Sequence, residues 1–371
     1  MKKKRSQTIL LVTLWLFVGA VFVAAQDIQS LVREIFPIPS ATGNENALAA
    51  KIELSLPKSV PKEKDPLGSL YVRLGKGEPR LAVLAALDEY GYIVSGITSD
   101  GYLRLDRAVT APHPLFDSYL LGHPVVVSTA NGLLEGIVSQ PAMHLLTRER
   151  RDELARNFSL DLVYLDIGTR SEEEVRAKGV EILDPVTFWP DLSELANQRW
   201  AGHALGQKTG CAVLLSLAGE TSASKFAQET TLGWLAQTKF PARGTRTALG
   251  AMRVKRKFLP QQVIILDMVP AERGEKSPAL GKGPVLVQAK EGPSKLKDQI
   301  EATARKMNIP LQYLTGVESS VMAPFLGDST EVVGLALPVK FPHTPVEVVD
   351  FKDAQALKKL LQGTLVSGRA K

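Results

Sequence analysis

The pattern of apolar and polar positions in the first quarter of the chain predicts two helices followed by two strands. The helices are expected over residues 27–35 and 44–56, and the strands, joined by a turn that contains glycine, over residues 65–87. Residues 81–87 (LAVLAAL) form an unbroken apolar run, which is typical of a strand buried on both faces of a parallel sheet. Asp88 and Glu89 follow this run directly. They are therefore expected at the carboxyl edge of the sheet, where α/β folds bind their ligands.

The segment from residue 90 to residue 191 has a different pattern. It contains short β-like pieces such as YIVSGI, HPVVVST and LVYLDIG, separated by turn residues at intervals of about 8–12 positions. Such spacing predicts a small β-barrel. Because mixed helix and strand patterns stand on both sides of it, we expect the barrel to be inserted into the first domain.

The last third of the chain again alternates strand and helix patterns. Strands are expected at QQVIILDM and EVVGLALPV, and helices at KLKDQIEATARKMN and DAQALKKLLQGTL. The predicted fold class is therefore α/β, with a doubly wound sheet domain in two parts, residues 26–89 and 192–371, interrupted by the barrel at residues 90–191. A basic connection that contains RVKRKF, residues 253–258, is interpreted as a solvated loop or edge.

The first 25 residues have the pattern of a targeting segment. An uncharged run over residues 9–25 follows Lys2, Lys3, Lys4 and Arg5 and ends in two alanines. This order predicts a cleaved signal peptide, residues 1–25, and hence export to a periplasm or to the extracellular space. An uncleaved N-terminal membrane anchor through residues 9–25 is the alternative, because the run has the length of a short membrane span.

Composition and charge narrow the classes of partner. Removal of the four basic residues of the targeting segment lowers the formal net charge of this 371-residue chain from +6 to +2. The remaining basic run, RVKRKF, has no second basic cluster nearby, so nucleic acid is not an expected partner. With 44% hydrophobic residues the chain can bury a full core, and its single cysteine, Cys211, is expected to be buried in a helix.

Common catalytic motifs are missing from the sequence. It has no GxSxG elbow, no HExxH motif and no phosphate-binding loop. His113, His123 and His144 lie in the insert, where structural or surface roles are expected. His343 follows an apolar strand in PVKFPHTPVEVVD, and both a functional and a structural role stay open for it. Asp267 follows the apolar residues VIIL and is a second strand-end carboxylate, or else a turn or cap residue.

The order and spacing of many segments resemble those of the tetrahedral aminopeptidases, a family that includes glutamyl and deblocking aminopeptidases and endoglucanase M-like proteins. The segments include PIPSATGNENALAAKI, GLLEGIVSQPAMHLLTRERRD, HALGQKTGCAVLLSL, LGKGPVL and PHTPVEVVDFKD. The resemblance implies a zinc-peptidase domain interrupted by a small barrel that is used for dimerisation, and assembly into hollow dodecamers. It also implies cleavage of residues from peptide N-termini with two metal ions.

In that family the metal ligands and the general base come from short motifs, which the resemblance carries over to this chain residue by residue. The histidine of a His-x-Asp-Glu motif aligns with Ala86 in ALDE, and the metal-bridging aspartate aligns with Gly206 in GQKTGC. In a Gln-Glu-Glu motif, the position of the base is Thr238 and that of the ligand is Lys239. A rival placement on AQETT keeps Glu229 as the base but loses the strand before it.

The resemblance therefore implies a remnant site, made of Asp88, Glu89, Lys239, Asp267 and His343. Alanine and glycine have no donor atoms, and an ammonium repels a metal cation. The two ligands that remain, Asp267 and His343, cannot hold zinc in a four-coordinate site. No intact catalytic group and no cofactor are expected. The alternative is a rearranged site that holds one zinc or other divalent ion on Asp88, Asp267 and His343.

Three functions follow from this comparison of motifs. The leading hypothesis is an exported, catalytically degenerate aminopeptidase homologue with a peptide-binding or assembly role. The second is an active metal-dependent aminopeptidase with a rearranged site. The third is a structural subunit that forms oligomers, mixed with an active paralogue. A homo-oligomer formed through the barrel is expected, and contact with a membrane only through residues 9–25 if they are not cleaved.

Lys239 is also predicted to replace the lost metal electrostatically. Carboxylates that are brought together without a cation repel one another or take up a proton. The Lys239 ammonium is therefore expected within about 4 Å of Asp88 or Asp267. The alternative is a lysine that points into solvent.

Overall fold

The structure of the protein is a computed structural model. It describes residues 27–77, 79–156, 158–220, 226, 228–241, 243–256, 259–272, 274, 277–290, 292–316, 319, 321–326 and 330–367. The predicted signal segment and the alternative anchor lie outside these residues, so export stays a prediction. Within the described ranges no helix is long and apolar enough to cross a bilayer.

An eight-stranded mixed sheet forms the centre of the larger domain. Its strands, in spatial order, are β1 (Lys62–Lys64), β2 (Leu70–Leu74), β12 (Glu229–Leu235), β3 (Pro79–Ala86), β13 (Gln262–Pro270), β16 (Glu331–Val339), β14 (Val285–Gln288) and β15 (Gln312–Thr315). The four central strands β12, β3, β13 and β16 are parallel. Their carboxyl ends therefore meet at one edge of the sheet.

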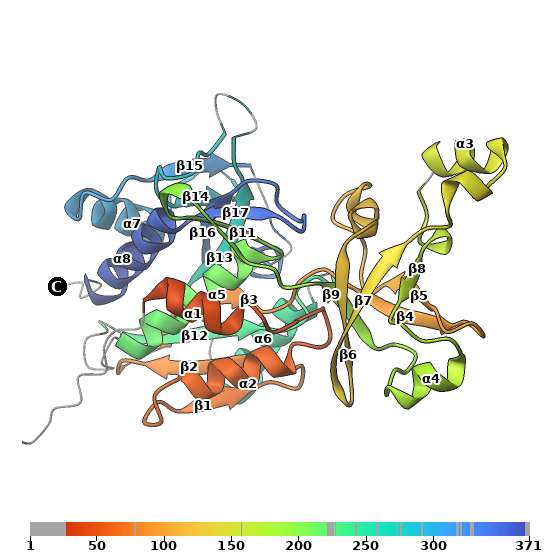
Figure 1. Ribbon diagram of the computed structural model, residues 1–371. Helices are drawn as coiled ribbons and strands as arrows, with labels where there is room; N and C mark the ends of the chain where they lie inside the picture. Colours follow the sequence, from red (N-terminus) through yellow and green to blue (C-terminus); the bar gives the residue numbers. More distant parts are fainter. Residues whose placement is uncertain are drawn as a thin grey trace, which may run out of the picture.

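Helices cover both faces of this sheet (Figure 1). They are α1 (Ile28–Ile35), α2 (Asn46–Ser55), α5 (Leu205–Glu220), α6 (Arg243–Arg256), α7 (Lys295–Lys306) and α8 (Phe351–Ser367). In β3, Leu81, Val83 and Ala85 belong to the core shared with α1, α5 and α8, whereas Ala82 and Leu84 belong to the core shared with α6. The unbroken apolar run of β3 is thus explained by burial on both faces.

A closed six-stranded barrel interrupts this domain and lies beside it (Figure 1). Its strands, in spatial order, are β4 (Tyr92–Ile97), β5 (Leu103–Arg107), β8 (Tyr164–Asp166), β7 (Gly132–Ser139), β6 (Pro124–Thr129) and β9 (Pro185–Phe188). The barrel has a core of its own, which includes Tyr92, Phe116 and Phe188, and it carries α3 (Arg148–Arg156) and α4 (Glu172–Ala177). The predicted fold class, a doubly wound α/β domain with an inserted barrel, is confirmed.

A small sheet of β10 (Ser193–Leu195), β11 (Arg199–Gly202) and β17 (Glu347–Asp350) completes the fold. Two local predictions were wrong. Residues 253–256 of the basic connection end helix α6 and are not a loop, because Ala248, Leu249 and Met252 give the helix a buried face. Asp267 lies within β13 and not at its end. Cys211 is buried in α5, as predicted.

Candidate functional site

The ends of neighbouring parallel strands bring the predicted site residues to one edge of the sheet. In β3 and β12, Ala86 is paired with Leu235, and the main-chain N–H of Leu87 then donates to the carbonyl of Leu235 at 2.8 Å. The two chains therefore leave the sheet side by side. This places Asp88 next to Thr238 and the residue that follows it.

Both carboxylate oxygens of Asp88 are occupied by hydrogen bonds from the protein. Oδ1 accepts from the Thr238 hydroxyl at 2.6 Å, and Oδ2 accepts from the Thr42 hydroxyl at 3.0 Å and from the main-chain N–H of Lys239 at 2.8 Å. Asp88 and Thr238 are fully buried. Thr238 stands where the resemblance places a general base, and its hydroxyl is a donor to Asp88.

The Lys239 ammonium lies in the field of several carboxylates but does not pair with one. Its nitrogen is 5.4 Å from the centre of the Tyr90 ring, and within the described part of the chain it has no ion pair with Asp88 or Asp267. Burial lowers the pKa of Lys239, but attraction by Asp88, Tyr90, Asp267 and Glu347 outweighs it, so the pKa is raised. The expected contact with Asp88 is thus made by the main chain, and the predicted close ion pair was wrong.

Gly206, the second residue of α5, has no room for a side chain. A Cβ atom on Gly206 would lie 2.8 Å from Sδ of Met268 and 2.9 Å from Cγ2 of Val339. Met268 and Val339 therefore fill the space into which an aspartate at position 206 would extend. The position of the expected bridging ligand is now part of the packed interior.

Glu347, at the start of β17, connects Gly206 to His343. Its Oε2 accepts from the Gly206 N–H at 3.0 Å, and its Oε1 accepts from the His343 N–H at 2.7 Å. Burial raises the pKa of Glu347 to about 7, although the hydrogen bonds from these two N–H groups oppose the shift. The His343 ring packs edge-on against Tyr90, with 5.2 Å between ring centres. Burial, and then the charge of Lys239, lowers the pKa of His343 to about 3.

Glu89 belongs to a second buried cluster at the start of α5. Its Oε1 accepts from the Ser40 N–H at 2.6 Å, and its Oε2 lies 3.6 Å from both Nε2 of His203 and Nζ of Lys208. The Lys208 ammonium also donates to the carbonyls of Phe36 and Ile38, at 2.9 and 2.7 Å. Burial lowers the pKa of both His203 and Lys208, and the attraction of Glu89 opposes the shift.

The donor set at this edge does not fit the dinuclear zinc centre that the resemblance implies. Ala86, Gly206 and Lys239 stand at three expected ligand positions and supply no donor to a metal. In the described ranges, no group of three or more His, Cys, Asp or Glu side chains is arranged to hold a metal ion, so the alternative set of Asp88, Asp267 and His343 is not preformed. The cavity beside His343, also lined by Met268, measures about 10 Å³, which is room for about one water.

Three residues of this site were missed by the sequence analysis: His203, Lys208 and Glu347. A signal existed for Lys208, since a lysine on the largely apolar helix GQKTGCAVLLSLAG must either be exposed or have a buried partner. Glu347 stood within the quoted segment PHTPVEVVDFKD. Its two partners lie 141 and 4 positions away, and the distant one could not be found from local patterns.

Comparison with known proteins identifies the family. The sequence matches the M42 glutamyl aminopeptidase family over residues 68–360. The chain belongs to this family. Among curated relatives of this M42 protein, the lysyl aminopeptidase of Pyrococcus furiosus is 26% identical over 349 residues, which cover 90% of this chain and 96% of the relative.

Solved structures agree with the assignment. The Pyrococcus horikoshii TET1 peptidase, described as able to assemble into a tetrahedron or a large octahedral shell, is 25% identical with a TM-score of 0.78, and the match covers 92% of this chain and 100% of that chain. The TET aminopeptidase of a marine sediment archaeon, Thaumarchaeota, has the same TM-score of 0.78 at 23% identity, covering 92% and 96%. The latter likeness shows the fold.

Proposed function

We propose that this M42-family protein binds peptides but does not cleave them, since it has no metal-activated water to act as the nucleophile. The observation that carries the proposal is the convergence of Ala86, Gly206 and Lys239 at one sheet edge, where they offer no ligand to a metal. A metal ion would supply the nucleophile by lowering the pKa of a bound water. Without its ligands, the fold keeps the position of the site but lacks the source of that nucleophile.

An active aminopeptidase is the second candidate, and the relatives favour it. Their names describe aminopeptidases, such as the lysyl enzyme of Pyrococcus furiosus. Such an activity would need Asp267 and His343 to bind a metal after a rearrangement. The Oδ1 atom of Asp267 accepts from the Met268 N–H at 2.8 Å, and among the described residues none donates to its Oδ2, so this second oxygen could bind a metal.

Aminoacyl chromogenic substrates distinguish the two candidates. Purified protein is incubated with a panel of aminoacyl p-nitroanilides, with added zinc or cobalt and with or without a chelator. The proposal predicts no chelator-sensitive turnover, together with retention of peptides in equilibrium dialysis. Turnover that the chelator stops, and that Asp267→Asn and His343→Ala both abolish, supports the active aminopeptidase. Turnover unchanged in both variants comes from a contaminant.

We also propose that the protein forms homo-oligomers through the barrel. Leu133 and Ile137, two apolar residues on the same face of β7, are each more than half exposed, and exposed apolar residues that lie together favour association. The assembly described for the Pyrococcus horikoshii TET1 peptidase supports the proposal. Light scattering of the full chain should show an oligomer that the double variant Leu133→Glu, Ile137→Glu disrupts. A monomer at micromolar concentration would contradict it.

A further inference from the structure

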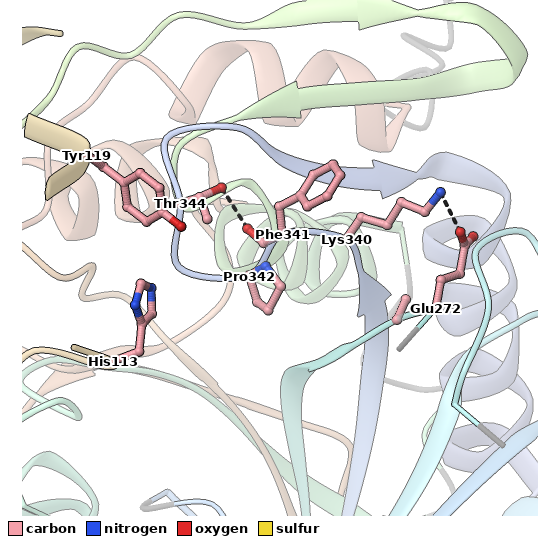
Figure 2. A pocket seen from close by; sticks show the side chains of 8 residues that line it. His113, Tyr119, Glu272, Lys340, Phe341, Pro342 and Thr344 are labelled. Carbon is pink, nitrogen blue, oxygen red and sulfur yellow. Dashed lines mark hydrogen bonds and ion pairs between the residues drawn. The ribbon is translucent and has the colours of Figure 1, made fainter. Parts of the chain in front are cut away.

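A second cavity opens between the barrel and the α/β domain, next to the site described above. It has a volume of about 550 Å³ and is lined by His113 and Tyr119 from the barrel side, and by Ala271, Glu272 and residues of the loop after β16. In Figure 2, His113 and Tyr119 lie on one side of this loop, and the Lys340–Glu272 ion pair lies on the other. Its size is that of a typical small-molecule or peptide cleft.

The loop after β16 holds an aromatic side chain in solvent at an energetic cost. Phe341 has a φ of +52° and leaves 58% of its surface exposed. A bulky residue with positive φ is a rare outlier, worth about 1–3 kcal/mol of strain. Within the described part of the chain, packing leaves more than half of Phe341 uncovered. Strain of this kind accumulates at sites of ligand binding.

Hydrogen bonds around the loop keep Phe341 in this conformation. The Thr344 hydroxyl donates to the Phe341 carbonyl at 2.7 Å, and the Lys340 N–H donates to the Val348 carbonyl at 3.1 Å. The buried Glu347 carboxylate accepts from the His343 N–H at 2.7 Å. These hydrogen bonds fix the backbone of the loop at both ends and in the middle, so little backbone entropy is lost when Phe341 contacts a ligand.

Aromatic rings also line the barrel side of the cleft. His113 packs edge-on against Tyr119 and against the buried Phe116, with 5.8 and 6.0 Å between ring centres. These contacts anchor the two rings to the core of the barrel. A cleft with anchored aromatic rings on one wall and the Phe341 ring on the loop suits an aromatic side chain, since such rings stabilise one another beyond their buried area.

We propose that this cleft binds peptides through an aromatic side chain, with Phe341, Tyr119 and His113 as the residues that determine specificity. Lys340 and Glu272 also line the cleft but are paired with each other, so the aromatic side chain of the peptide, and not its termini, carries the recognition. The inference rests on the proposed function, because it names the peptides that a non-cleaving relative would retain.

Isothermal titration calorimetry of the full chain with Ala-Phe-Ala, Ala-Leu-Ala and Ala-Ala-Ala tests the inference. Ala-Phe-Ala should bind about tenfold tighter than Ala-Ala-Ala, which corresponds to the energy of a favourable aromatic contact. Phe341→Gly should reduce that preference to about threefold or less while leaving the affinity for Ala-Ala-Ala unchanged. Glycine adopts positive φ without strain, so the variant should unfold at the same temperature as the parent or higher.

Tyr313→Ala is the matched control, because Tyr313 is an aromatic residue that is 53% exposed, like Phe341, but lies on β15 outside the cleft. It should leave the preference for Ala-Phe-Ala intact. Tight binding of Ala-Phe-Ala that Phe341→Gly and Tyr119→Leu both leave unchanged would overturn the assignment to this cleft, while peptide binding would stand. Equal affinity for all three peptides would also overturn it. If none of the peptides binds, the proposed function itself fails.

Discussion

The main-chain N–H of Lys239, and not its ammonium, is the group that contacts Asp88, at 2.8 Å from Oδ2. The polypeptide itself thus supplies hydrogen-bond donors to the carboxylate. Two hydroxyls complete the set, so a buried acceptor has partners without any cation. At the place where a metal centre was expected, hydrogen bonds to Asp88 join the segments that follow β3 and β12.

Thr238→Val tests how much that junction contributes to stability. Valine keeps the shape of threonine but removes the hydroxyl that donates to Asp88, so a buried carboxylate oxygen loses its partner. The free energy of unfolding, from urea titration, should fall by about 1–3 kcal/mol. Thr245→Val is the control, since Thr245 is equally buried and its hydroxyl has no hydrogen-bond partner in the structure as described. It should be neutral or stabilising, and equal losses for both variants would contradict the account.

Lys208→Met and Lys239→Met should differ in their cost. The Lys208 ammonium is buried, donates to two carbonyls and lies beside Glu89, so its removal leaves a buried carboxylate without its cation. We expect a loss of about 3–5 kcal/mol in the free energy of unfolding. Lys239 is half-buried and keeps its main-chain contact in the variant, so the loss should be about 1 kcal/mol or less. A larger loss for Lys239→Met would restore the direct electrostatic role predicted from sequence.

Gly206→Ala tests whether the former ligand position is closed by packing. The added methyl group would lie within 3 Å of Met268 and Val339, so overpacking should cost about 1–3 kcal/mol. Met268→Ala should relieve that cost in a double-mutant cycle. Gly210→Ala, in the same helix, meets nothing within 4 Å and should be stabilising by up to about 1 kcal/mol. If Gly206→Ala is as well tolerated as Gly210→Ala, the position is not closed.

Local pattern was enough to predict the fold, and in part the site. The run 81–87 identified the central strand because burial on both faces removes polar positions, and the carboxylates that follow it indeed lie at the strand ends. Helix α6 was missed because its many basic residues obscured the short apolar stripe of Ala248, Leu249 and Met252. Asp267 was predicted at the end of its strand because a charged residue followed an apolar run, whereas β13 continues to Pro270.

The contacts of the site could not be predicted in the same way. Whether the Lys239 ammonium or its N–H contacts Asp88 depends on the turn after β12, which has a positive φ at Gln237. The filling of the space at Gly206 depends on Met268, which lies 62 positions further along the chain. Contacts of this kind depend on residues that are far apart in the sequence, so they cannot be predicted from the residue type at one position.

Asp353 should make stability depend on pH. Its carboxylate accepts from the N–H groups of Gly281 and Gly283, each at 2.7 Å, and burial raises its pKa from 3.8 to about 6. The folded state therefore holds the proton more tightly, so this contribution is present below pH 3.8 and is lost as the pH rises through 6.

Asp353→Asn removes the titrating group. Between pH 4 and pH 7, the free energy of unfolding of the parent should fall relative to that of the variant by up to about 3 kcal/mol. Urea titrations of both proteins across this range measure the difference. A parallel pH dependence in the two proteins would show that Asp353 does not hold the raised pKa in the folded state.

The most direct test of the central claim is the metal content of the protein after equilibration with zinc. Full-length protein is dialysed against micromolar zinc and separated from free metal. Its zinc content is then measured by inductively coupled plasma mass spectrometry, with the His343→Ala and Asp267→Asn variants in parallel. The account predicts the same trace of zinc in all three proteins, because the strand-end site has too few donors. One or two zinc ions per chain in the parent, lost in both variants, would contradict it.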